Sequence, residues 1–271
     1  MIDGKTKVVG LIGNPVEHSF SPAMHNAAFN ILNLNYKYLA FKVLDLEKAI
    51  YGAGELGIVG LNVTIPHKVD VIQYLDELDS TAEKIGAVNT VDLVNLKGYN
   101  TDGIGAIRAL EEVTSLKGKN VVVAGAGGAS RAISFNLANS KIAGLTILNR
   151  NLKKAESLAS DIGDVSYDST DKIDSYLKDA DILIDTTPVG MDPNINDKPI
   201  ATADMMHEDL IVNDIVYNPL ETVLLKEAEA AGATTVSGLK MLLYQGVESF
   251  KVFTGRDAPA GVMEKELLKL I

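Results

Sequence analysis

Short apolar runs alternate with amphipathic segments along the whole chain. Up to Val113, apolar and β-branched runs predict strands, and segments with helical spacing or a capping residue predict helices. The expected strands are Lys7–Ile12, Tyr36–Val43, Gly60–Thr64, Val88–Leu93 and Gly98–Asn100. The expected helices are Pro22–Leu32 with Ser21 as its N-cap, Asp45–Glu55, Pro66–Leu75 begun by its proline, and Asp102–Val113.

A second series of strands and helices begins after Lys119. The expected strands are Val121–Ala124, Leu145–Leu148, Ile182–Asp185, Leu210–Asp214 and Thr234–Val236. The expected helices are Arg131–Asn139, Leu152–Ser160, Thr222–Ala231 and Lys240–Phe253. Repeated strand–helix units predict an α/β fold with a parallel, doubly wound sheet, and we expect a boundary between two domains at the helix that starts with Asp102.

Composition and charge narrow the range of partners. The 271 residues carry a net charge of −11, with 25 lysines and arginines against 36 aspartates and glutamates. Nucleic acids and anionic membranes need a basic surface, so neither is an expected partner. The chain has no cysteine, and its four histidines lack metal-ligand spacing, so we expect no disulfide and no metal site. The amino-terminal segment resembles neither a signal peptide nor a membrane span, which favours a cytoplasmic protein.

A glycine-rich turn follows the apolar strand Val121–Ala124 and opens the next helix. It reads Gly125-Ala126-Gly127-Gly128-Ala129, with Ser130 at the position of the third glycine of the dinucleotide-binding fingerprint. Glycine permits the tight turn and the close approach of a pyrophosphate, and the helix N-terminus offers free N–H groups to that anion. The motif predicts a dinucleotide site; a glycine turn without a ligand is the alternative.

The residues after the following strand indicate which dinucleotide binds. Enzymes that use NAD carry an aspartate or glutamate there to bind the ribose hydroxyls. Here the residues are Asn149, Arg150 and Asn151, followed by Lys153 and Lys154. Arg150 can pair with a 2′-phosphate through its planar guanidinium, and no carboxylate repels that phosphate. We therefore expect NADP rather than NAD; a solvated basic helix start is a credible alternative for the two lysines and less so for Arg150.

The loop after the strand Ile182–Asp185 consists mainly of small and polar residues, from Thr186 to Met191. In a doubly wound sheet the carboxyl ends of the strands face the ligand. The loop is therefore expected to line the nicotinamide, and an ordinary strand–turn connection is the alternative.

Hydride reduction of a ketone needs a proton and a positive charge at the developing alkoxide. Lys68 is the best candidate, because it falls in the first turn of the expected helix Pro66–Leu75, where a cation opposes the helix dipole. A cation in the first turn of a helix is unfavourable, and such an unfavourable position indicates a functional residue. The alternative is that Lys68 is an ordinary surface lysine that reaches into water. Asp102 begins another expected helix. It can orient Lys68 and a substrate hydroxyl, serve as a plain N-cap, or do both.

Uncharged polar residues at strand ends fit a polyhydroxylated substrate. Asn62, Thr64 and Asn89 offer donors and acceptors for ring hydroxyls. Ser19 and Ser21 precede a helix and would point the same way in an extended segment. Two hydroxyls at a helix start suit a substrate carboxylate, and capping by Ser21 alone is the simpler alternative.

In their order along the chain, these motifs resemble the shikimate dehydrogenase family over essentially the whole length. The matching residues are His18-Ser19-Phe20-Ser21-Pro22 with His25-Asn26, Asn62-Val63-Thr64 with Pro66-His67-Lys68, Gly86-Ala87-Val88-Asn89-Thr90, Asn100-Thr101-Asp102-Gly103, Gly125-Ala126-Gly127-Gly128-Ala129, Asn149-Arg150, Thr187 with Gly190-Met191, Tyr217-Asn218-Pro219, and Gly238-Leu239-Lys240-Met241-Leu242 with Gln245. Several motifs are weak singly, but so many in one order make a chance match negligible.

The resemblance implies an NADP-dependent oxidoreductase that reversibly reduces 3-dehydroshikimate to shikimate in aromatic amino acid biosynthesis. It implies an α/β substrate-binding domain of residues 1–101 completed by residues 239–271. A Rossmann-like NADP-binding domain would comprise residues 102–238, with a deep cleft between the two domains. The expected ligands are this small-molecule substrate and NADP, bound by a monomer or a homodimer.

The resemblance also implies a role for each matched residue. Lys68 would be the acid–base residue, with Asp102 as its partner, and Ser19 and Ser21 would hold the substrate carboxylate. The ring substituents would contact Asn62, Thr64, Asn89, Asp102, Tyr217 and Gln245. NADP would contact Gly125, Ala126, Gly127, Gly128, Ala129, Asn149, Arg150 and Thr187, with Ile215, Gly238 and Met241 near its nicotinamide.

One departure and two rival functions stay open at this point. The family usually has threonine after Asn149 and Arg150, where this chain has Asn151, whose amide can still hydrogen-bond a phosphate. A quinate/shikimate dehydrogenase that uses NAD would differ in how its pocket pairs one extra ring hydroxyl. A non-catalytic NADP(H) sensor of the same fold would not need Lys68 and Asp102 together.

Overall fold

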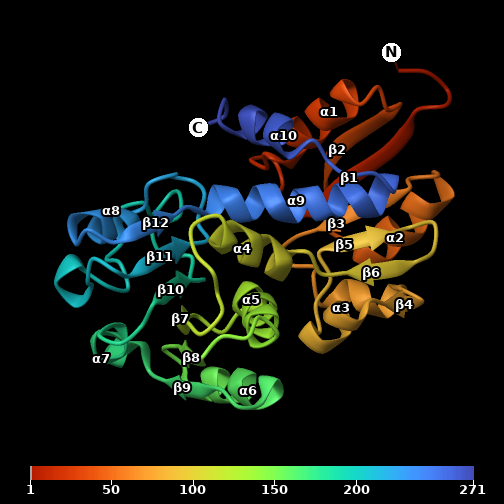
Figure 1. Ribbon diagram of the computed structural model, residues 1–271. Helices are drawn as coiled ribbons and strands as arrows, with labels where there is room; N and C mark the ends of the chain where they lie inside the picture. The colour runs from red at the N-terminus through yellow and green to blue at the C-terminus, as the bar shows by residue number, and fades with distance from the viewer. Residues whose placement is uncertain (1) are drawn as a thin grey trace. The chain divides into compact units, whose positions relative to one another are not determined.

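The computed structural model describes residues 2–271, and the chain divides into two compact units (Figure 1). The first unit comprises the chain up to Thr101 together with Leu243–Leu270, and the second comprises Asp102–Leu242. Each unit has its own six-stranded sheet. Within residues 2–271, no helix combines the length and the apolarity needed to cross a membrane.

The sheet of the first unit is mixed. Its strand order is β2 (Tyr36–Lys42), β1 (Lys7–Gly13), β3 (Gly60–Val63), β5 (Thr90–Asp92), β6 (Lys97–Tyr99) and β4 (Glu77–Leu78). β1 pairs in parallel with β2 and β3, whereas β5 runs antiparallel to β3 and to β6. A fully parallel sheet is therefore a wrong prediction for this unit, because a tight connection such as the one between β5 and β6 joins antiparallel strands.

Helices cover both faces of this first sheet. They are α1 (Ser21–Ile31), α2 (Leu46–Glu55), the 3₁₀ helix η1 (Asp70–Tyr74), α3 (Ser80–Ile85), α10 (Ala260–Leu267) and the larger part of α9 (Gly238–Thr254). Leu61 and Val63 of β3 pack in one apolar cluster with residues of α2 and η1. Gly60 alternates with them and faces α9, where a Cβ at this position would collide with the Phe253 ring.

The sheet of the second unit is parallel throughout. Its strand order is β12 (Thr234–Val236), β11 (Ile211–Asp214), β10 (Ile182–Asp185), β7 (Asn120–Ala124), β8 (Gly144–Leu148) and β9 (Ser166–Asp168). The order along the chain reverses between β7 and β10. The carboxyl ends of these two strands therefore flank the switch point at which doubly wound sheets bind ligands.

Helices also lie on both faces of the second sheet. They are α4 (Asp102–Glu111), α5 (Gly128–Ala138), α6 (Leu152–Ile162), the 3₁₀ helix η2 (Thr170–Lys172), α7 (Ile173–Leu177), the 3₁₀ helix η3 (Ala203–Met205) and α8 (Val223–Ala230). Ile147 of β8 packs with residues of α6, whereas its neighbour Leu148 packs with residues of α7 and α8. Successive strand residues point to opposite faces, so the sheet is doubly wound as predicted.

Three predicted helix starts are wrong, and one of them is Arg131, because α5 begins at Gly128. Helix α1 begins at Ser21 itself, and Phe20 occupies the N-cap position without a side-chain cap. Pro66 lies in a run of turns that leads into η1 and does not begin an α-helix. The Lys68 carbonyl accepts a hydrogen bond from Val88 N–H at 2.8 Å. This tertiary bond takes the carbonyl that an α-helix would use for its own ladder.

Candidate functional site

The glycine-rich turn lies at the switch point between β7 and β10. Gly125 has a φ of +111°, which residues with a side chain rarely adopt, and a Cβ there would collide with Thr186 Oγ1. The Thr186 hydroxyl donates to the Ala124 carbonyl at 2.6 Å and so fastens the ends of the two strands. Ser130, fully buried, donates to the Gly125 carbonyl at 2.7 Å. Ser130 thus stabilises the turn from the position of the fingerprint's third glycine.

Gly127 and Gly128 leave space for a ligand at the start of α5. Gly127 occupies the N-cap position, and no side chain caps the helix. A Cβ on either glycine would meet no atom within 4 Å. Both glycines are exposed, and Ala126 and Ala129 beside them are half-buried. An open backbone with uncapped helix N–H groups fits the pyrophosphate of a dinucleotide.

Arg150 is exposed beyond the end of β8, in a turn that its neighbours hold. The Asn149 N–H donates to the Asp168 carbonyl at 3.1 Å, and the Asn149 side chain donates to the Asn151 carbonyl at 2.9 Å. The Asn151 side chain caps α6 by accepting from Lys154 N–H at 3.4 Å. Within residues 2–271, the Arg150 guanidinium has no ion pair or hydrogen bond, so it remains available to an anionic ligand.

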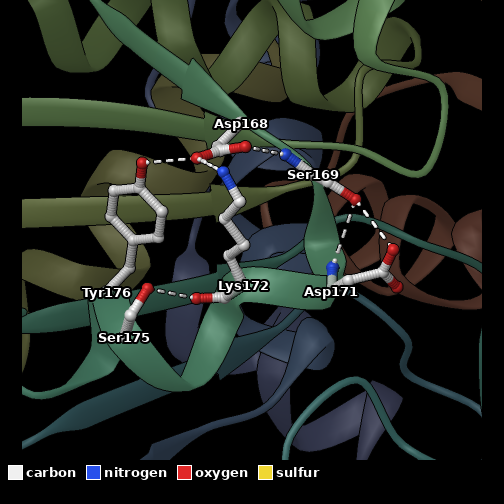
Figure 2. A network of polar contacts seen from close by, with 6 residues as sticks. All are labelled: Asp168, Ser169, Asp171, Lys172, Ser175 and Tyr176. Carbon is white, nitrogen blue, oxygen red and sulfur yellow. Dashed lines mark hydrogen bonds and ion pairs between the residues drawn. The ribbon is translucent and has the colours of Figure 1, made fainter.

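A polar network surrounds Asp168, the last residue of β9 (Figure 2). One carboxylate oxygen accepts from Ser169 N–H at 2.8 Å, and the other accepts from Lys172 Nζ and from the Tyr176 hydroxyl, each at 3.0 Å. The Ser169 hydrogen bond and then the Lys172 hydrogen bond hold the pKa of Asp168 below its usual value. The backbone of Asp168 therefore supports the Asn149 turn, while its carboxylate is balanced by a cation.

Two buried carboxyl groups lie next to each other at the ends of β10 and β11. Burial and the neighbouring Asp214 charge raise the pKa of Asp185 to about 7, and burial raises the pKa of Asp214 to about 6. Asp185 accepts from Thr187 N–H at 2.8 Å. Asp214 accepts from Val216 N–H at 2.9 Å and from the Thr222 hydroxyl at 2.7 Å. Each carboxyl group therefore shapes the loop that follows its strand.

The loop after β11 contacts the start of α9. A Cβ on Gly238 would collide with the Ile215 carbonyl, and the Gly238 N–H donates to the Val216 carbonyl at 3.3 Å. Met241 follows on α9 and is buried. Tyr217, half-buried in the same loop, has a pKa that burial raises. The structure thus brings Ile215 and Gly238, both predicted to lie near the nicotinamide, into direct contact.

Lys68 is half-buried in a turn that is fixed on both sides. The His67 N–H donates to the Thr64 carbonyl at 3.0 Å, and the buried His67 ring bonds the Val43 carbonyl through Nε2 at 3.0 Å. The bond from Val88 N–H to the Lys68 carbonyl ties the turn to the segment that enters β5. The sequence context predicted that Lys68 lies in the first turn of a helix. The structure instead holds Lys68 in a turn that tertiary hydrogen bonds fix.

Asn62, Thr64 and Asn89 lie together at the end of β3 and the entry to β5. Asn62 and Asn89 are buried, and Asn62 Nδ2 donates to the Asn89 carbonyl at 3.1 Å. Thr64 is half-buried against Gly13, where a Cβ would collide with the threonine methyl group. These three residues and the Lys68 turn form one polar cluster within the first unit.

The sequence predicted that Ser19 and Ser21 lie in an extended segment, and this prediction is wrong. Phe20 between them has a φ of −83° and a ψ of −10°, which are helical values. The Ser19 hydroxyl accepts from Ser21 N–H at 3.2 Å, which leaves its own hydrogen for another acceptor. Ser21 is buried near the Tyr38 hydroxyl.

Asp102 and Gln245 belong to different units. Asp102 is buried at the first position of α4, and the next residue, Gly103, packs so closely on α5 that a Cβ would collide with the Asn136 side chain. Gln245 lies on α9, and its carbonyl accepts from the Ser249 hydroxyl at 2.9 Å. Close helix packing fixes Asp102, and a hydrogen bond within α9 supports the turn that carries Gln245.

Among residues 2–271, four fully buried polar residues of the first unit were not predicted as site residues. They are His25, Tyr38, Thr90 and Ser249. Tyr38 donates to Asn62 Oδ1 at 2.8 Å, and Ser249 accepts from Asn62 Nδ2 at 2.8 Å. Ser249 follows Gln245 by four residues on one helix face, a spacing that offered a signal. No local pattern linked Tyr38 to Asn62.

The parallel second sheet, its glycine turn and the Arg150 guanidinium are the features of a dinucleotide-binding protein with a doubly wound sheet. Three family models match successive parts of the chain. They are the shikimate dehydrogenase substrate binding domain over residues 11–91, shikimate / quinate 5-dehydrogenase over residues 108–218, and the shikimate 5′-dehydrogenase C-terminal domain over residues 238–268.

Whole-chain relatives agree with these models. The shikimate dehydrogenase (NADP(+)) of Methanobrevibacter smithii is 62% identical over 279 residues, covering 100% of this chain and 99% of its own. A crystal structure of a shikimate dehydrogenase in complex with NADP⁺ has a TM-score of 0.95 at 50% identity, covering 99% of this chain and 97% of its own. A Listeria monocytogenes shikimate 5-dehydrogenase in complex with shikimate and NAD has a TM-score of 0.90 at 36% identity, covering 97% of both chains. The chain belongs to the shikimate dehydrogenase family.

Proposed function

We propose that this chain is an NADP-dependent shikimate dehydrogenase that reversibly reduces 3-dehydroshikimate to shikimate. The observation that carries the proposal is the Lys68 turn, which stands beside Thr64 and Asn89 in a chain of this family. We assign substrate binding to residues 1–101 with 239–271, and NADP binding to residues 102–238. A small-molecule substrate is the expected partner, and the protein acts as a monomer or a homodimer.

The substrate carboxylate is assigned to the serines before α1. Ser19 retains a hydroxyl hydrogen because its oxygen accepts from Ser21 N–H. The start of α1 adds a partial positive charge that favours an anion. The ring hydroxyls are assigned to Thr64, Asn89, Asp102, Tyr217 and Gln245, which offer donors and acceptors.

Proton transfer is assigned to Lys68. In the oxidation of shikimate, the neutral Lys68 amine takes the proton of the reacting hydroxyl as the C–H bond breaks. In the reverse direction, the Lys68 ammonium returns that proton to the alkoxide oxygen. Asp102 is assigned as its partner, because a carboxylate can balance the ammonium and hold the same hydroxyl in place. Bound NADP supplies the hydride acceptor or donor.

The cofactor is assigned to the carboxyl edge of the second sheet. Gly127 and Gly128 leave backbone N–H groups free for the pyrophosphate, and Arg150 offers a planar cation to the 2′-phosphate. The remaining assigned contacts are Gly125, Ala126, Ala129, Asn149, Thr187, Ile215, Gly238 and Met241. Asn151, the residue that departs from the family pattern, caps α6 with its side chain.

Oxidation of shikimate by the purified protein tests this function. NADPH formation is followed by absorbance with shikimate and NADP⁺, beside matched reactions with NAD⁺ and with quinate. Fast NADPH formation that collapses in Lys68→Ala supports both the reaction and the role of Lys68. Preference for quinate and NAD⁺ would overturn the substrate and cofactor assignments. NADP⁺ binding without turnover of any substrate would favour a sensor.

A further inference from the structure

A buried hydrogen-bond network joins five segments of the first unit. We call it the Asn62 network. Its side chains are Tyr38 of β2, Asn62 of β3, Asn89 and Thr90 at the start of β5, Thr101, and Ser249 of α9. All six are at most 5% exposed. Because buried polar groups must find partners inside the protein, the network determines how these segments fit together.

Both ends of the Asn62 amide are hydrogen-bonded inside the protein. Its oxygen accepts from the Tyr38 hydroxyl at 2.8 Å. Its nitrogen has two hydrogens and three acceptors in reach: Ser249 Oγ at 2.8 Å, Thr90 Oγ1 at 3.0 Å and the Asn89 carbonyl at 3.1 Å. No hydrogen of this amide is left over for a ligand. Asn62 therefore has no hydrogen left to donate to a substrate, and it also acts on the substrate through its neighbours.

Ser249 is the point where α9 joins this network. Its hydroxyl hydrogen goes to the Gln245 carbonyl at 2.9 Å, since a carbonyl can only accept. The Ser249 oxygen then accepts from Asn62, and it lies 2.9 Å from Thr90 Oγ1 and 3.3 Å from Thr101 Oγ1. One small side chain thus links the helical turn that carries Gln245 to the strand ends of the site.

The network also holds Asn89. The Asn89 side-chain oxygen accepts from Thr101 N–H at 2.8 Å, and the Thr90 hydroxyl lies 3.1 Å from the same oxygen. Ser249 contacts both threonines. A change at Ser249 therefore reaches Asn89 through Thr90 and Thr101, and reaches Gln245 directly.

We propose that Ser249 and Tyr38 are positioning residues for shikimate binding, acting through the Asn62 network on Asn89 and on the α9 turn that carries Gln245. The inference rests on the proposed function. Removing the Tyr38 hydroxyl takes away the donor to the buried Asn62 oxygen, and removing the Ser249 hydroxyl takes away the shortest of the three contacts of the Asn62 amide nitrogen. The amide then rotates or shifts, and Asn89 loses the orientation in which it meets the substrate.

Steady-state kinetics of Ser249→Ala and Tyr38→Phe test this proposal. Each variant should raise the KM for shikimate about tenfold, with a smaller change in kcat, because the affected groups bind the substrate in ground and transition states alike. The KM for NADP⁺ should stay within about twofold, because the network lies in the unit that is not assigned to the cofactor. Ser249→Cys, which keeps a weak donor and acceptor, should recover part of the loss.

Thr254→Ala is the matched control. Thr254 lies on the same helix and donates to the Phe250 carbonyl at 2.8 Å, as Ser249 does to that of Gln245, but it is outside the network. It should lower the melting temperature without changing the KM for shikimate. Equal KM values for shikimate in the wild type, Ser249→Ala and Tyr38→Phe would overturn this inference and leave the proposed function standing. Absence of wild-type turnover with shikimate would overturn the proposed function, and this inference with it.

Discussion

The ring of His25 stacks on the ring of Tyr38, with centroids 4.4 Å apart and planes inclined by 7°. His25 is fully buried, and within residues 2–271 neither of its ring nitrogens has a hydrogen-bond partner. Burial lowers the pKa of His25 from 6.5 to about 3. Between these values the unfolded chain binds a proton that folded His25 does not, so this residue makes the fold less stable as pH falls.

We therefore expect His25→Phe to flatten the acid side of the stability profile. The free energy of unfolding of the wild type should fall faster than that of the variant from about pH 6.5 downward, by up to about 1.4 kcal/mol for each pH unit. Denaturant unfolding at several pH values measures this difference. His18→Gln, at an exposed position, is the control and should keep the wild-type slope. Parallel profiles for the wild type and His25→Phe would contradict the expectation.

The buried pair Asp185 and Asp214 predicts a pH dependence of opposite sign. The pKa of each carboxyl lies above its usual value of 3.8, so the folded protein holds protons that the unfolded chain releases. This contribution to stability is present at low pH and is lost as pH rises from about 4 to about 7.

Asp185→Asn should therefore raise the melting temperature at about pH 8, with a gain that shrinks toward about pH 4.5. The amide oxygen keeps the acceptor for Thr187 N–H, so the loop after β10 retains its shape. Thermal unfolding of both proteins at the two pH values measures the effect. Asp209→Asn, at an exposed position, should change neither value. A melting temperature below that of the wild type at about pH 8 would show that the ionised pair is stabilising.

Much of the fold follows from local patterns in the sequence. The apolar runs of the second unit correctly predict β7, β8, β10, β11 and β12, and the predicted helix starts at Asp45 and Thr222 are confirmed by side-chain caps. The strand β9 is missed because its three residues are exposed or half-buried and show no apolar pattern. The helix expected at Pro66 does not form, because tertiary hydrogen bonds fix that segment as turns.

Some residues of the candidate site can also be predicted from local sequence, and others cannot. The glycine turn and Arg150 can be recognised in the sequence because each lies on one short segment with a local physical reason. The Asn62 network cannot, because its partners come from distant segments: Ser249 is 187 residues from Asn62. From sequence, Asn62 is a free amide at a strand end. In the structure its amide is already bonded on both sides.

Two alanine substitutions in the glycine turn should separate folding from cofactor binding. Gly125→Ala introduces a side chain at positive φ and against Thr186, so it should lower the melting temperature clearly. Gly127→Ala meets no protein atom and has a φ of −92°, so the melting temperature should stay close to that of the wild type. Its methyl group should instead occupy the space assigned to the pyrophosphate and weaken NADP⁺ binding. Titration calorimetry and thermal unfolding measure the two effects, and unchanged NADP⁺ affinity in Gly127→Ala would remove the pyrophosphate from this turn.

Arg150 should set the preference for NADP⁺ over NAD⁺. Charge-assisted hydrogen bonds contribute about 1.5–3 kcal/mol, so Arg150→Ala should raise the KM for NADP⁺ by about 10- to 100-fold. The KM for NAD⁺, which lacks the 2′-phosphate, should change much less. Lys153→Ala removes an equal charge from an exposed position nearby and is the control. If a general attraction between charges explained the preference, both variants would lose the same factor. A loss confined to Arg150→Ala and to NADP⁺ assigns it to direct pairing with the phosphate, whereas equal losses for the two cofactors would mean that Arg150 contacts a group they share.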